Sequence, residues 1–314
     1  MKKIYFNIFF QIIALIIIVK IVFLEEQNFE KFLFIFSFKV VPVFLVAIII
    51  KVILTYLFYK LINIFSFKKN DYIDVANFFL QGGVINQLLP GVGFVYKYYR
   101  LKYSYNINLI EFTTAQIIWS LFVFTSYIIL AIVLGFVVIS FSNFELGLLI
   151  TIISSITLIF YLSRKKLYRT LRNNLIYNSK ITELIKNLKK IKDLLFTKFF
   201  IFLFIFIGFI LLGIIECINF YHGLTVFGGN VSFISSNFIF ITSSLASFIA
   251  IINFFGLFEF ILTLSSSFII PEFNDMLVFA FAFRIINLTA TFTMIICLTL
   301  LKYLKNIMKK KTYD

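Results

Sequence analysis

Long apolar runs alternate with short polar and charged segments along the 314 residues of the chain. A run of about 20 apolar residues can cross a hydrocarbon core of about 30 Å as a helix. The runs are continuously apolar and lack the strict alternation of strands in an outer-membrane barrel. The pattern therefore predicts an all-α, polytopic membrane protein, a helical bundle with about six full spans. We predict these spans at residues 4–24, 32–65, 109–140, 146–163, 199–220 and 276–301.

Two further stretches, 72–99 and 236–270, are apolar but interrupted. The first is broken by glycines and by Pro90, and its second half gives about 15 Å of helix, roughly half of a crossing. The second is broken at Gly256, and its remaining part gives about 21 Å of helix. Broken backbone at membrane depth is tolerated only where protein or a water-filled cavity surrounds it. We therefore predict two re-entrant, broken-helix hairpins that line a polar cavity.

The distribution of charge orients the predicted spans, because cytoplasmic loops of membrane proteins hold an excess of Lys and Arg. With a cytoplasmic N-terminus, the basic segments lie inside and the acidic loops lie outside, provided that 72–99 turns back to the cytoplasm and 236–270 turns back to the outside. We therefore expect a multi-pass protein of the bacterial inner membrane with both termini in the cytoplasm. The opposed hairpins also suggest two inverted halves, with a transport site near the midplane, although the sequence shows no clear internal repeat.

Composition agrees with this class of protein. The chain is 61% hydrophobic and only 14% charged, whereas soluble domains are about a quarter charged. A net charge of +15 would suggest nucleic acid in a soluble protein, but these cations flank apolar spans and indicate topology and contact with anionic lipids. We therefore treat 1–314 as a single transmembrane domain that binds no nucleic acid.

The most basic segment, 164–198, is predicted to be a cytoplasmic loop. Apolar positions within it recur at helical spacing. Two interpretations stay open: an amphipathic helix at the membrane interface, and a solvated helix that connects two spans.

The first hairpin carries the first candidate site. Its Pro-Gly-x-Gly turn permits close approach of the backbone, and the short helix that follows directs its positive N-terminal end at the cavity, which favours an anion such as phosphate. Its cations could hold a lipid headgroup or could only enforce orientation. Its glycines could alternatively serve tight helix packing, but for Gly91 and Gly93 we favour the break. The candidate headgroup-binding residues here are Asn86, Gln87, Pro90, Gly91, Gly93, Lys97 and Arg100.

Glu259 and Arg284 form the second candidate site, because ionisable residues inside apolar segments are functional candidates with an expected partner. They lie in consecutive elements and could pair. Such a pair could be static, could couple to a proton or could contact a zwitterionic substrate. Glu216 is expected near the end of its helix, at a wet interface, and Lys51 has no obvious partner.

No enzyme signature occurs in the sequence, which lacks a phosphate-binding loop, a His/Glu metal pattern and a nucleophile elbow. The two cysteines, Cys217 and Cys297, lie within apolar runs, and the lone His222 falls in a predicted loop, 221–230. We therefore expect no catalytic residue, no metal site and no cofactor.

The order and spacing of these motifs resemble a known family. Asn86, the Pro90–Gly91–x–Gly93 turn, Lys97 and the Tyr99–Lys102 segment, followed by Gly256–Glu259 and Arg284, are similar to the membrane region of lysylphosphatidylglycerol synthases and to related stand-alone membrane proteins. The resemblance covers essentially the whole chain. It implies a flippase-like bundle that moves a lipid between leaflets. The soluble aminoacyl-transferring domain is not matched, so lysyl transfer is not expected.

We therefore predict a translocator of a lipid or glycolipid that binds an anionic or zwitterionic headgroup between the two hairpins. The expected partners are membrane lipids, either an anionic phospholipid or a polyprenyl-linked glycolipid. The alternative is a non-transporting accessory protein that works with a glycosyltransferase or another enzyme of cell-envelope assembly.

Overall fold

The computed structural model describes most of the predicted bundle. The described ranges are 31–65, 70–88, 91–139, 197–249, 257–269 and 275–311. Every secondary-structure element in these ranges is helical, which confirms the all-α class. The predicted spans at 4–24 and 146–163, and nearly all of the basic segment 164–198, lie outside these ranges.

Four helices in the described part are long and apolar enough to cross a membrane. They correspond to four of the predicted spans. Their apolar portions are Phe38–Phe65, Leu109–Gly135, Phe199–Val226 and Met276–Met308. By the length and composition of these helices, the chain is therefore typical of a helical membrane protein.

By its internal contacts the chain divides into two compact units, one made of Met1–Ala131 with Ile205–Asp314 and the other of Ile132–Phe204. The second unit contributes only the end of α6 (Leu109–Ile139) and the beginning of α9 (Phe199–Val226) to the described residues. Everything described below lies in the first unit.

The long helices differ from the predicted spans mainly at their ends. Helix α3 (Val41–Phe65) begins next to Pro42, and two 3-10 turns, η1 (Phe34–Phe36) and η2 (Phe38–Val40), precede it. Helix α12 (Met276–Lys311) continues ten residues beyond the predicted span. Helix α9 continues to Val226, so His222 lies on a helix, and the loop predicted at 221–230 begins only after Val226. Two residues after the end of α9, at Gly228, the backbone enters the left-handed region with a φ of 86°.

The first interrupted stretch forms a hairpin of two packed helices, α4 (Tyr72–Leu88) and α5 (Val92–Tyr105). The break falls where the sequence predicts it, and Gly91 lies there with a φ of 85°. The side-chain oxygen of Asn86 accepts a 2.7 Å hydrogen bond from the Gly91 amide and so closes the turn. Asn86 and Gly91 therefore shape the tip of the hairpin.

Gly93 has a different role from Gly91, because it lies where α4 and α5 cross. A Cβ on Gly93 would collide with the carbonyl oxygen of Gly82 and with Asn86, and a Cβ on Gly82 would collide with the Lys97 side chain. Here the packing alternative holds, and our preference for a break at Gly93 was wrong. Close contact through glycines is a common way for two helices to pack in membranes.

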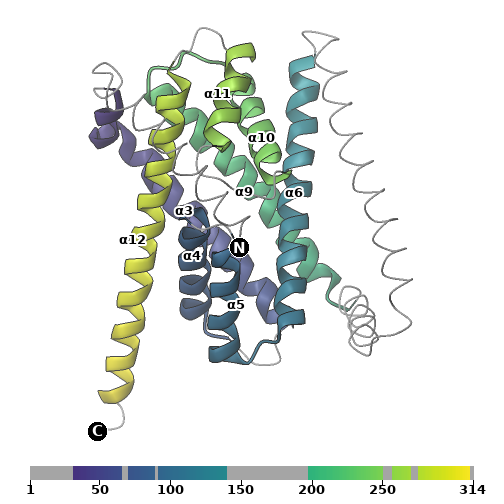
Figure 1. Cartoon of the computed structure of the whole chain (residues 1–314), viewed down its shortest axis with the longest axis vertical. Helices are drawn as coiled ribbons and strands as arrows, with labels where there is room; N and C mark the ends of the chain where they lie inside the picture. The colour runs from purple at the N-terminus through teal and green to yellow at the C-terminus, as the bar shows by residue number, and fades with distance from the viewer. Residues whose placement is uncertain are drawn as a thin grey trace, which may run out of the picture. The chain divides into compact units, whose positions relative to one another are not determined.

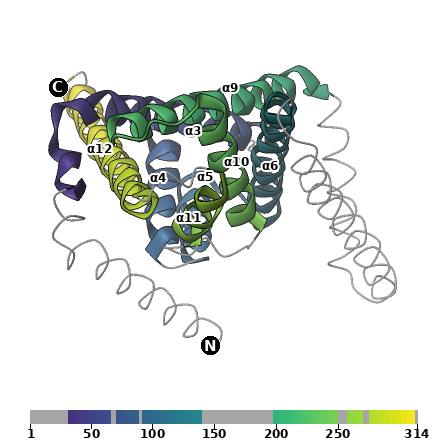
Figure 2. The same ribbon diagram turned by 90° about the horizontal axis from the view of Figure 1, so that it is seen from above.

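The second interrupted stretch also forms two packed helices, α10 (Phe233–Ile249) and α11 (Leu257–Ile269). Figure 1 shows the α4–α5 hairpin toward the lower end of the view and the α10–α11 pair toward the upper end. Viewed from above, the two pairs overlap (Figure 2). Within the first unit, the two hairpins thus lie one above the other.

Each hairpin is fixed to the long helices by an aromatic cluster. Phe79 of α4 packs on Phe58 of α3 and on Trp119 of α6, with ring centroids 4.5 and 5.1 Å apart. On the other side, Phe240 of α10 stacks on Phe220 of α9 at 4.7 Å. Such ring pairs stabilise a fold by about 0.5–1.5 kcal/mol each beyond their buried area, so they hold the hairpins in place.

Ion pairs join the ends of the helices. Lys302 of α12 lies 2.6 Å from Asp74 of α4, and Lys305 pairs with Asp71. The Tyr105 hydroxyl, at the end of α5, donates a 3.0 Å hydrogen bond to Asp74, and burial raises its pKa, so it stays protonated. At the other end of α12, Lys31 lies 2.7 Å from Asp275. The C-terminal end of α12 and the open end of the first hairpin therefore lie together.

Candidate functional site

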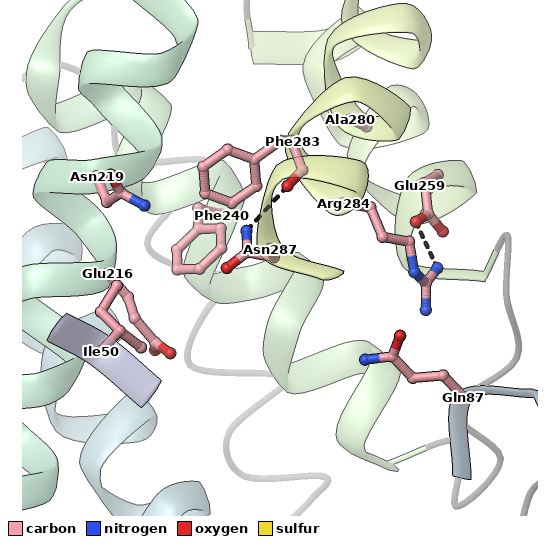
Figure 3. A pocket seen from close by; sticks show the side chains of 10 residues that line it. All are labelled: Ile50, Gln87, Glu216, Asn219, Phe240, Glu259, Ala280, Phe283, Arg284 and Asn287. Carbon is pink, nitrogen blue, oxygen red and sulfur yellow. Dashed lines mark hydrogen bonds and ion pairs between the residues drawn. The ribbon is translucent and has the colours of Figure 1, made fainter. Parts of the chain in front are cut away.

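A cavity of about 210 Å³ lies where the tips of the two hairpins approach the long helices (Figure 3). Gln87, in the last turn of α4, and Glu259, in the first turn of α11, both line it, so each hairpin contributes a polar side chain from beside its break. The other lining residues are Ile50 of α3, Glu216 and Asn219 of α9, Phe240 of α10, and Ala280, Phe283, Arg284 and Asn287 of α12.

Arg284 and Glu259 form an ion pair on one wall of this cavity, through Nη1 and Oε1. The Glu259 side chain is fully buried, whereas 15% of the Arg284 side chain is exposed. Because Glu259 lies in the first turn of α11, the positive end of that helix also stabilises its carboxylate. The pairing that the sequence only suggested is therefore present, and both partners line the cavity, with the guanidinium the more exposed of the two.

Glu216 lies on the opposite wall (Figure 3), and its predicted position near the end of its helix is wrong. It lies ten residues before the end of α9 rather than at a wet interface, because α9 continues to Val226. The Tyr127 hydroxyl of α6 donates a 2.5 Å hydrogen bond to its Oε2. A cation that acts on the same carboxylate is Lys51 of α3, which attracts it electrostatically without forming an ion pair within 4 Å in the described part of the chain.

Amide side chains complete the polar lining. Asn219 is 1% exposed, and neither its Oδ1 nor its Nδ2 has a hydrogen-bond partner within the described part of the chain. The buried Oε1 of Gln87 has none there either. The Nδ2 of Asn287 donates a 2.9 Å bond to the carbonyl oxygen of Phe283 (Figure 3). Buried amides of this kind are normally satisfied by protein or by a bound partner.

A sequence signal for these residues exists. Glu216 and Asn219 are three residues apart in one apolar run, and Arg284 and Asn287 are three residues apart in another. Residues at this spacing share a helix face. Two polar pairs with the same spacing in long apolar helices therefore indicate two faces of one polar cavity.

The predicted cations of the first hairpin do not line this cavity. The Lys97 ammonium lies 5.3 Å from the ring centre of Phe79, 5.9 Å from that of Phe58 and 3.5 Å from the Oε1 of Gln116. The Arg100 guanidinium lies 4.7 Å from the ring centre of Phe78. Both contacts are cation–π interactions that hold α5 on its neighbours.

Of the nine predicted site residues, the structure brings three to the cavity, namely Gln87, Glu259 and Arg284. Asn86 and Gly91 form the turn beside it, and Gly93 forms the helix crossing. Pro90 lies outside the described residues.

A second, apolar cavity of about 260 Å³ lies between the start of α3 and α12. Its α12 residues, Ile285, Ile286 and Thr289, lie on the face of that helix opposite Arg284 and Asn287. Charged lining is therefore found on one side of α12 and apolar lining on the other.

Comparisons of the chain with known protein families, with curated proteins and with solved structures found no match. The described part of the chain is a helical bundle with four helices that could cross a membrane and a cavity partly lined by charged and amide side chains. The resemblance to the membrane region of lysylphosphatidylglycerol synthases stays a prediction.

Proposed function

We propose that the chain is a flippase-like translocator of a lipid or glycolipid in the bacterial inner membrane. The observation that carries this proposal is the cavity at the tips of two helical hairpins, which an ion pair and three amides line within a largely apolar bundle. A charged side chain at the centre of a bilayer costs at least about 2.5–3.5 kcal/mol. Polar groups kept there are therefore expected to serve a polar substrate.

The arrangement of the hairpins supports alternating access. In transporters with inverted repeats, broken helices enter from opposite faces and meet at a central site, and the two halves rock around it. Here the two hairpins lie one above the other, and Gln87 and Glu259 line one cavity from their tips. We propose that both hairpins are re-entrant, the first from the cytoplasm and the second from outside. A headgroup would then cross the membrane through the cavity while its tails stay in the lipid.

Transport is tested by reconstitution. In proteoliposomes that contain the full chain, we expect accelerated movement between leaflets of at least one class among fluorescent anionic, aminoacylated and polyprenyl-linked lipids, measured by quenching of the outer leaflet. Ile296→Ala, at a 59% exposed position of α12, is the control and should transport normally. Well-folded protein that moves none of these lipids, and that copurifies with an envelope glycosyltransferase, would favour the accessory role instead.

Orientation is tested by cysteine labelling in a background with Cys217 and Cys297 replaced by serine. We expect Tyr103→Cys, at the end of α5, and Met308→Cys, at the end of α12, to react with a membrane-impermeant maleimide only from the cytoplasmic side, since both positions are exposed and those helix ends lie together. Phe38→Cys, which is 94% exposed before α3, should react only from outside. Labelling of Tyr103→Cys and Met308→Cys from opposite sides would refute a first hairpin that returns to its starting face.

A further inference from the structure

We infer that the group bound in this cavity is a hydroxyl-bearing headgroup without net negative charge, such as a sugar or another polyol. This inference rests on the proposed function and specifies its substrate class. It replaces the anionic or zwitterionic headgroup that the sequence suggested with a neutral one.

The charges of the lining do not favour an anion. Two carboxylates, Glu216 and Glu259, and one guanidinium, Arg284, line the cavity, so the lining carries a formal charge of −1. Lys51 does not line the cavity, but it attracts Glu216 electrostatically. With Lys51 included, the formal charges around the cavity sum to zero. Phosphate sites in proteins instead present an excess of cations or free backbone amides. The guanidinium here is already paired with a fully buried carboxylate.

Lys97 and Arg100, the two cations predicted to hold a headgroup, do not line the cavity. The Lys97 ammonium lies against the rings of Phe58 and Phe79 and near the side-chain oxygen of Gln116. Arg100 lies over Phe78. Because neither residue lines the cavity, the first hairpin contributes a neutral amide, Gln87, at this place.

The amides require a ligand that both donates and accepts hydrogen bonds. Asn219 offers two donor hydrogens and a carbonyl oxygen, and Gln87 offers a carbonyl oxygen without a described partner. A fully ionised phosphate only accepts, so it would leave both amide oxygens unsatisfied. A trimethylammonium group has no N–H to donate, so it fails in the same way. A hydroxyl group does both, and several hydroxyls on one ring could satisfy Asn219, Gln87 and the carboxylates together.

The remaining lining and the size of the cavity agree with a ring-shaped polyol. The side chains of Phe240 and Phe283 stand between the amides of Asn219 and Asn287 in Figure 3 and provide an apolar surface for the C–H groups of a ring. The volume of about 210 Å³ is far above the roughly 10–15 Å³ that one water needs, and it is below the range of about 300–1,000 Å³ for drug-sized ligands. One headgroup therefore fits, and a large oligosaccharide does not.

The test measures which lipid stays bound to the full chain. The protein is first placed in nanodiscs that contain equal amounts of three lipids with identical dioleoyl tails: monoglucosyldiacylglycerol, phosphatidic acid and phosphatidylcholine. It is then purified out of the nanodiscs, and the lipids that copurify with it are quantified. We expect the glucolipid to be enriched about tenfold or more over the other two, the ratio that one or two extra hydrogen bonds provide. Preferential retention of phosphatidic acid or phosphatidylcholine, or equal retention of all three, overturns the inference.

Two variants locate the effect. Asn219→Leu should remove most of the enrichment of the glucolipid. Asn237→Leu is the matched control, because Asn237 of α10 is equally buried and its amide is also without a described partner, yet it does not line the cavity. Enrichment that survives Asn219→Leu, or that both variants reduce equally, overturns the assignment to this cavity.

Competition by a soluble sugar distinguishes a failure of this inference from a failure of the proposed function. Methyl glucoside is added to the nanodiscs as a competitor. If it displaces the glucolipid only at concentrations far above those of the lipid, the source is a membrane glycolipid, and both proposals are supported. If it binds as well as the glucolipid, the polyol class holds and the lipid translocator fails. Transport of all three lipids without preference would support the translocator and overturn the polyol class.

Discussion

Replacing Arg284 with alanine is expected to lower the free energy of unfolding by about 3–5 kcal/mol, because it leaves a carboxylate buried without its charged partner. Glu259→Ala should destabilise the protein less, because the Arg284 side chain that it leaves without this carboxylate is 15% exposed, whereas the Glu259 side chain is fully buried. Both single variants should lose transport. Unfolding by denaturant in mixed micelles measures the first effect, and lipid movement in proteoliposomes measures the second.

The double variant Glu259→Leu/Arg284→Met distinguishes a static pair from a functional one. A buried ion pair replaced by apolar residues of similar volume often leaves stability unchanged or raised. We therefore expect stability to return close to that of the unmodified protein while transport stays lost. If the double variant moves lipid at the normal rate, the pair only supports the fold, and the cavity loses its charged participant in transport.

The spans, the break and the ion pair could be predicted from the sequence because each depends on local chemistry. Continuous apolar runs leave a helix as the only way to satisfy the backbone in lipid, and a proline beside glycines marks the turn at Gly91. Two opposite charges in consecutive apolar elements attract each other strongly, so the contact between Glu259 and Arg284 could be predicted.

The direction of Lys97 could not be predicted as long as Gly93 was assigned to the break. Residues four apart lie on the same face of a helix, so Lys97 shares the face of Gly93. Since Gly93 packs on Gly82 of α4, Lys97 must lie against α4 as well, and its side chain indeed crosses Gly82. The sequence alone does not show how α5 is rotated about its own axis. The contact between Gly93 and Gly82 sets that rotation and therefore the direction of Lys97.

The same reasoning explains why Glu216 was undervalued. A residue ten positions before the end of a helix lies about 15 Å from that end, which is deep within a bilayer core of about 30 Å. The predicted end of the span, at residue 220, placed it one turn from the interface. An error of six residues in a helix end thus changed a partly buried member of the cavity into a surface carboxylate.

Gly93→Ala is expected to have the largest effect of any glycine replacement in the first hairpin. Its Cβ would meet backbone, the carbonyl oxygen of Gly82, which cannot move aside as a flexible side chain can. Overpacking of this kind costs about 1–3 kcal/mol and sometimes more, and it would push α5 away from α4. Because Gln87 lies one turn beyond the crossing, we expect transport to fall together with stability.

Gly83→Ala is the matched control in the same hairpin. A Cβ at Gly83 meets no atom within 4 Å, and alanine in a helix interior is favoured over glycine by about 0.5–1 kcal/mol. Gly83→Ala should therefore be neutral or stabilising, while Gly93→Ala lowers the unfolding midpoint and the transport rate. If the two variants behave alike in both measurements, the close crossing of α4 and α5 is not what positions the tip of the hairpin at the cavity, and the part of the mechanism that depends on that crossing is wrong.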